Sequence, residues 1–96
     1  MTRAIVLNPA DNVATLIDSG GAGTACALQG EATHPLKLAA DIPFGHKVCI
    51  RDIGAGAPVV KYGQVIGRAS RAIAAGEHVH THNVEAARGR GDQPGR

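Results

Sequence analysis

The stretch Ile42-Pro43-Phe44-Gly45-His46-Lys47-Val48 indicates the fold most directly, because its pattern occurs three times in the chain. Ile, two residues, Gly, two residues and Val recur at residues 53–59 and 73–79. The pattern joins an apolar anchor, a turn that uses the left-handed conformations open to glycine, and a valine that starts a strand. Three copies at uneven spacing do not form a solenoid. They predict one supersecondary unit that is reused around a small barrel-like or clip-like core.

The composition of the 96-residue chain predicts one small all-β domain. Thirteen glycines and five prolines imply many tight turns and little helix. One Phe, one Tyr and no Trp leave the core to Ile, Val, Leu and Ala. A chain of this size is near the lower limit for building its own core, so a partner would add stability. We expect a domain over residues 1–86 and a disordered polar tail over residues 87–96.

Short apolar runs predict the other strands. We expect these at residues 3–7, 13–17, 25–28 and 36–38. The glycine-rich residues 19–24 lack the Lys-Ser or Lys-Thr ending of a phosphate-binding loop and therefore predict a turn. Val65 and Ile66 are expected to be buried. Gly63 and Gly67 would permit a turn or a close approach of two backbones.

Charge and hydropathy argue against several classes of partner. The net charge is +2, and the basic residues are not interleaved with the aromatic residues that stack on bases, so nucleic-acid binding is not expected. No apolar run approaches the ~20 residues of a membrane span, and the N-terminus lacks a signal-peptide pattern. We therefore expect a cytoplasmic protein, with Cys26 and Cys49 as buried, reduced thiols.

Residues 76–84 read Gly-Glu-His-Val-His-Thr-His-Asn-Val and concentrate three of the five histidines of the chain. As a strand, this stretch would place alternate side chains on one face. The side chains on that face would be His78, His80 and His82. Imidazole is a common metal ligand and titrates near neutral pH, so this face predicts a chemical site. The alternative is an exposed polar strand face, because a metal site needs a further ligand from His46, His34 or another chain.

Three stretches, in this order, resemble the SAF domain of the altronate and galactarate dehydratase family. They are Asp41-Ile42-Pro43-Phe44-Gly45-His46-Lys47-Val48 with Ile50-Arg51-Asp52-Ile53, Val60-Lys61-Tyr62-Gly63-Gln64-Val65-Ile66-Gly67, and residues 76–84. The resemblance extends over residues 3–86. It implies a β-clip fold, as in the SAF modules of sialic acid synthases and type III antifreeze proteins.

The resemblance also implies an activity. A SAF-like small subunit would work with a separate large catalytic subunit as a hydro-lyase that dehydrates sugar acids to 2-keto-3-deoxy acids, and it would be inactive alone. The implied cofactor is a divalent metal shared with the large subunit, Fe²⁺ first and Mn²⁺ or Mg²⁺ as alternatives. His80 and His82 are the predicted metal ligands or acid/base groups. His46, Lys61 and Asn83 are the predicted substrate contacts.

Two other functions fit the same resemblance. The small subunit of a sulfolactate sulfo-lyase has the same architecture but expels sulfite instead of water. A non-catalytic SAF module would bind carbohydrate only. For the histidines of a lyase subunit, the alternative to a chemical role is that they only shape the interface with the large subunit. Association of the chain with copies of itself is compatible with each of these functions.

Overall fold

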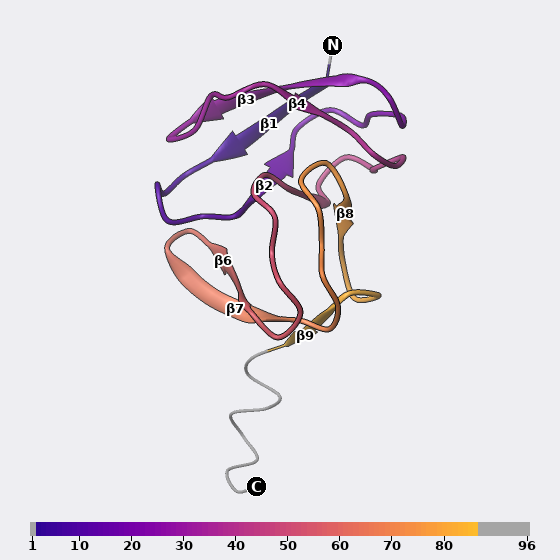
Figure 1. Cartoon of the computed structure of the whole chain (residues 1–96). Helices are drawn as coiled ribbons and strands as arrows, with labels where there is room; N and C mark the ends of the chain where they lie inside the picture. Colours follow the sequence, from indigo (N-terminus) through magenta and orange to yellow (C-terminus); the bar gives the residue numbers. More distant parts are fainter. Residues whose placement is uncertain (1, 87–96) are drawn as a thin grey trace, which may run out of the picture.

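The computed structural model describes residues 2–86, which form two sheets of short strands and contain no helix (Figure 1). In chain order the strands are β1 Thr2–Val6, β2 Val13–Leu16, β3 Ala25–Gly30, β4 Leu36–Lys37, β5 Lys47–Cys49, β6 Pro58–Lys61, β7 Gln64–Ala69, β8 His78–Val79 and β9 Val84–Ala86. The larger sheet has the order β4-β3-β1-β2-β5-β8 and the smaller has β6-β7-β9. Only the β1–β3 pair is parallel among these strands. The all-β prediction is confirmed, and the predicted tail at residues 87–96 lies outside the described residues.

The repeated pattern forms the same local structure each time, and the structure contains a fourth copy that the sequence pattern did not reveal. Each copy has a glycine at positive φ, namely Gly23 (86°), Gly45 (84°), Gly56 (81°) and Gly76 (97°). The fourth copy spans residues 20–26, where Gly20 and Cys26 stand in place of Ile and Val. A Cβ on Gly20 would lie 2.5 Å from Leu38 Cδ1. Leu38 therefore occupies the space that an isoleucine side chain would need, which explains the glycine.

The four copies associate in two pairs with the same pattern of backbone hydrogen bonds. Gly20 and Ile42 exchange two bonds of 2.8 and 3.0 Å, and Ile53 and Ile73 exchange two of 2.8 Å. In each copy the glycine N–H also donates to a carbonyl four residues before the start of the paired copy. These bonds are Gly23 to Leu38, Gly45 to Leu16, Gly56 to Ala69, and Gly76 to Cys49, at 2.7–2.9 Å. The predicted supersecondary unit thus works as an interlocked pair.

An aspartate completes each pair. Asp41 Oδ1 accepts a hydrogen bond of 2.9 Å from the Ala22 N–H in the turn of the paired copy. Asp52 Oδ1 accepts the equivalent bond, also 2.9 Å, from Ala75. Both carboxylates satisfy backbone donors that the turn leaves without a partner.

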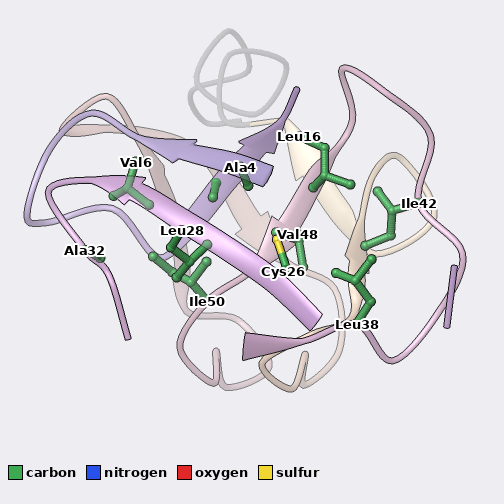
Figure 2. Close-up of a cluster of buried hydrophobic side chains, with 11 residues drawn as sticks. Ala4, Val6, Leu16, Cys26, Leu28, Ala32, Leu38, Ile42, Val48 and Ile50 are labelled. Atoms are coloured by element: carbon green, nitrogen blue, oxygen red, sulfur yellow. The ribbon is translucent and has the colours of Figure 1, made fainter. Parts of the chain in front are cut away.

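Two apolar clusters fill the interior, and β2 and β5 lie between them. The first cluster contains Ala4, Val6, Ala14, Leu16, Cys26, Leu28, Ala32, Leu38, Ile42, Val48 and Ile50 (Figure 2). The second contains Val13, Cys49, Ile53, Val59, Ala69, Ile73 and Val79. Adjacent residues of β5 point to opposite faces, so Val48 enters the first cluster and Cys49 the second. In Figure 1, β1, β3 and β4 lie at the upper end of the molecule and β6, β7 and β9 at the lower end.

The β6–β7 hairpin corrects one prediction and confirms another. Val65 was expected to be buried but is 50% exposed, because β9 pairs only with residues 67–69 and leaves the tip of β7 uncovered. Tyr62 (φ 57°) and Gly63 (φ 75°) form a two-residue turn. A Cβ on Gly67 would lie 2.3 Å from the Glu85 carbonyl oxygen, which confirms a close backbone approach.

Both cysteines are free and buried, as predicted. The Cys49 thiol donates to the Arg51 carbonyl oxygen over 2.9 Å, and burial raises its pKa to about 11. A thiol held in the protonated form is a poor nucleophile and a poor metal ligand. Within residues 2–86 there is also no helix long and apolar enough to cross a membrane.

Two glycine replacements separate the backbone requirement of the repeated unit from its packing. Gly23 and Gly76 both have positive φ, but a Cβ on Gly23 meets nothing within 4 Å, whereas on Gly76 it would lie 2.3 Å from the Lys37 carbonyl oxygen. We expect Gly23→Ala to lower the free energy of unfolding by about 1 kcal/mol through backbone strain alone. Gly76→Ala should lower it by roughly 3 kcal/mol. Urea denaturation measures both values, and equal losses would contradict the close approach of the Gly76 backbone to the Lys37 carbonyl.

Candidate functional site

Residues 76–84 do not form the single strand that the sequence suggested. Strand β8 ends at Val79, residues 80–83 form a turn, and β9 begins at Val84. The chain uses this turn to pass from the larger sheet to the smaller one. The alternation of side chains along a strand therefore does not put the three histidines on one face, and that part of the prediction is wrong.

Asn83 holds the turn in place from inside the protein. Its side chain is fully buried, its Oδ1 accepts from the His80 N–H over 3.0 Å, and its Nδ2 donates to the His78 carbonyl over 2.9 Å. The Asn83 N–H donates to the His80 carbonyl over 3.1 Å. Local bonds of this kind compete with strand pairing and favour turns. Asn83 was predicted to contact substrate, and the structure places its amide against the turn backbone instead.

The turn nevertheless brings the histidines together. Four imidazoles, here called the histidine cluster, form a connected group in which each ring contacts at least one other ring. They are His46, His78, His80 and His82. His46 and His80 stack at 4.3 Å between ring centroids, and His78 lies 5.3 Å from His82. Among residues 2–86, the remaining histidine, His34, lies elsewhere and contacts the Ile50 carbonyl oxygen over 2.9 Å.

His78 connects the cluster, although the sequence predicted it only as a member of the histidine face and gave it no role of its own. Its Nε2 shares a hydrogen bond of 2.9 Å with His46 Nδ1, and its ring contacts three other rings. The register pairs Val48 with His78 and Lys47 with Val79, so the ends of two copies of the repeated unit meet here. The strands that contain the valines of these two copies, β5 and β8, pair with each other. The repeated pattern could have suggested this pairing and therefore the contact between His46 and His78.

The surroundings of the cluster are positively charged. The pKa of His78 is lowered, first by burial and then by the charges of neighbouring groups, which are His46, His82, His80 and Lys47. The pKa of Lys47 is lowered by burial and then by the charge of Lys61. Lys61 Nζ lies 4.7 Å from the centre of the Tyr62 ring. Among residues 2–86, neither lysine side chain forms a salt bridge. This surface therefore favours the neutral form of His78 and attracts anions.

The described residues do not form a complete metal site. Within residues 2–86 no group of three or more His, Cys, Asp or Glu side chains is arranged to hold a metal ion. His46 and His78 use one nitrogen each in their mutual bond, and His80 Nδ1 lies 3.3 Å from Thr81 Oγ1. His80 and His82 are exposed, so His80 Nε2 and the nitrogens of His82 are available to an ion whose other ligands come from elsewhere.

Replacing Asn83 tests its role in the turn. Asn83→Ala removes two side-chain hydrogen bonds from a buried position, so we expect the free energy of unfolding to fall by about 2 kcal/mol. Thr81→Ala, an exposed change in the same turn, should alter it by less than about 0.5 kcal/mol. Urea titrations of both variants measure the difference. Equal effects would mean that the turn does not depend on Asn83.

The low pKa of His78 predicts acid sensitivity. The unfolded chain takes up a proton at the ordinary pKa of about 6.5, while the folded state resists protonation, so stability is full above that pH and is lost as pH falls below it. We expect the urea midpoint, measured with a chelator present, to fall between about pH 7.5 and 5.5. His78→Gln should reduce this fall. An identical pH dependence in the variant would exclude His78 as its source.

Comparison with known proteins agrees with the fold and the sequence motifs. The family model described as "Altronate/galactarate dehydratase SAF domain" matches residues 2–87. Altronate dehydratase from Escherichia coli K12 is 40% identical over 80 residues, which are 83% of this chain and 16% of that protein. Galactarate dehydratase (L-threo-forming) from the same organism is 39% identical over 77 residues, 78% of this chain and 14% of that protein.

A third relative is nearer to this chain in length. The (2R)-sulfolactate sulfo-lyase subunit alpha of Chromohalobacter salexigens is 38% identical over 72 residues, which are 75% of this chain and 77% of that protein. The chain thus spans most of this relative but less than a fifth of the two dehydratases. Because the family match covers all of the described residues, the chain belongs to the SAF-domain family of altronate and galactarate dehydratases.

Proposed function

We propose that this chain is the small subunit of a hydro-lyase that dehydrates sugar acids to 2-keto-3-deoxy acids together with a large catalytic subunit. The observation that carries the proposal is the histidine cluster. Four imidazoles gather near Lys47 at the junction of the two sheets, in a domain of a family whose named relatives are lyases or dehydratases. Such a surface suits an anionic substrate and proton transfer.

The need for a large subunit is supported by the comparisons. The match to altronate dehydratase covers 16% of that enzyme, so most of the enzyme lies outside the part that resembles this chain. The sulfo-lyase relative is itself named as a subunit alpha. Within residues 2–86 no group of three or more His, Cys, Asp or Glu side chains could hold a metal ion by itself. A partner would supply the missing groups.

The chemistry assigns roles to residues of this chain. Dehydration removes the proton next to the carboxylate and then the hydroxyl group at the β position, and negative charge builds up on the intermediate. His80 or His82, where it is not a metal ligand, would donate a proton to the departing hydroxyl. Lys61 and His46 would contact the carboxylate. Asn83 would act indirectly, by fixing the backbone of the turn that carries His80.

A divalent metal fits the exposed imidazoles of His80 and His82 as two of its ligands, with the remainder from the large subunit. Imidazole nitrogen suits Fe²⁺ better than it suits Mg²⁺ or Mn²⁺, which prefer oxygen ligands. When bound, the ion would stabilise the negative charge of the intermediate. His78 lies between the two ligands, 5.6 Å from His80 and 5.3 Å from His82 between ring centroids, and would keep their rings oriented.

A sulfo-lyase small subunit is the second candidate. The specific observation in its favour is size, since the chain covers 77% of the sulfolactate sulfo-lyase subunit alpha. The leaving group would be sulfite instead of hydroxide, and the same positive surface would face a sulfonate. Assays of the assembled enzyme with a sugar acid and with sulfolactate distinguish the two by the product formed.

Single histidine replacements test the proposed function. In the complex reconstituted with its large subunit, we expect His80→Ala and His82→Ala each to lower kcat by about a hundredfold or more and to lower the content of bound metal. His34→Ala is the matched control, because His34 lies outside the cluster, and it should retain full turnover. Unchanged kcat and metal content in the first two variants would reduce the cluster to a structural role at the interface.

A further inference from the structure

Lys47 lies in a small pocket that sequence reasoning did not identify. The pocket has a volume of about 170 Å³ and opens where β5 and β8 of the larger sheet approach β7 and β9 of the smaller one. Its walls are mainly apolar, with Lys47, His80 and Thr81 as the polar members. The apolar members are Ile66, Val79, Val84 and Ala86.

The position of Lys47 on its strand explains why it enters this pocket. In β5, Val48 points into the first apolar cluster, so Lys47 and Cys49 point to the other side. Cys49 is buried there, and Lys47 lies at the edge, opposite Val79 in the register. The apolar part of the lysine side chain can pack on the walls of the pocket, which His80 also lines, while its ammonium group stays near the pocket mouth.

Among the described residues, Lys47 has no counterion. The lysine is half-buried, and among residues 2–86 its ammonium group forms no salt bridge. The charged groups that act on it and on its neighbour His78 are Lys61 and the imidazoles, all of the same sign when protonated. A partly desolvated positive charge of this kind is stabilised when an anion enters the pocket.

We propose that this pocket binds the carboxylate of a small hydroxy acid, with Lys47 as the ion-pair partner and Lys61 as a more distant contributor to the field. The proposal deepens the proposed function, because it places the carboxylate end of the substrate beside His80. It makes Lys47, rather than Lys61, the principal carboxylate contact. The volume of the pocket suits one end of a sugar acid, and the rest of the acid would extend along the histidine cluster.

Binding to the ¹⁵N-labelled chain alone tests the pocket without any need for turnover. Galactarate, at matched ionic strength, should shift the amide signals of Val79, Thr81 and Val84 with a Kd on the order of 10 mM or lower. Galactitol, which has the same carbon skeleton without carboxylates, should leave them unchanged. The absence of shifts with galactarate, or equal shifts with galactitol, would overturn the proposal.

Variants of Lys47 make the test specific. Lys47→Gln and Lys47→Met should each weaken galactarate binding by about tenfold or more, and Lys47→Arg should retain it. The spectrum of each free variant reports whether it is folded, and Lys47→Met preserves the apolar contacts of the lysine. Lys37→Gln removes an exposed lysine outside the pocket and should have no effect. Equal weakening in Lys37→Gln would indicate general attraction of anions and overturn the assignment.

A carboxylate on the large subunit is the other source of the same chemistry. If the large subunit, added without acid, displaces galactarate from the pocket, the ion-pair partner of Lys47 is a side chain of that subunit and the substrate assignment fails. If the pocket binds galactarate but the assembled complex has no lyase activity, the carboxylate site remains and the proposed function fails. The two hypotheses therefore fail separately.

Discussion

The two hydrogen bonds between Ile53 and Ile73 are the contact on which the arrangement of the site depends. Each residue donates to the carbonyl of the other over 2.8 Å, and this exchange interlocks the second and third predicted copies of the repeated unit. The glycine turn of the third copy then directs β8 alongside β5. That pairing brings His46 at the end of one glycine turn next to His78 at the end of another. His46 and His78 are 32 positions apart in the sequence, and they meet because the strands that end two copies of the repeated unit pair with each other.

The site lies where the chain changes from one sheet to the other. A continuous strand through residues 76–84 would have kept the histidines in the larger sheet. The buried amide of Asn83 instead closes a turn, and the chain proceeds into β9 of the smaller sheet. The turn leaves His80 and His82 exposed and forms one wall of the pocket that contains Lys47. Junctions of this type are common places for binding sites, because two layers supply side chains to one hollow.

Much of the fold followed from the sequence, because its signals are local. The Ile, Gly and Val positions of the repeated pattern, the turn at Gly63 and the close approach at Gly67 each depend on the backbone properties of one or two residues. The fourth copy was hidden, since Leu38 fills the place of its missing isoleucine and Leu38 is distant in sequence from Gly20. The exposure of Val65 depends on where β9 ends its pairing with β7, which no local pattern encodes.

The candidate site was predicted in composition but not in geometry. His46, His80 and His82 do come together, yet through a turn and through the β5–β8 pairing instead of strand alternation. Lys47 and His78 depend on long-range register, which sequence spacing alone could not supply. We propose that the histidine cluster completes an active site shared with a larger subunit. An experimental structure of the chain with that subunit and a bound acid would test this proposal most directly. His80 or His82 nitrogens should then lie within about 2–3.5 Å of the acid or its metal. A cluster open to solvent, about 10 Å or more from the acid, would contradict it.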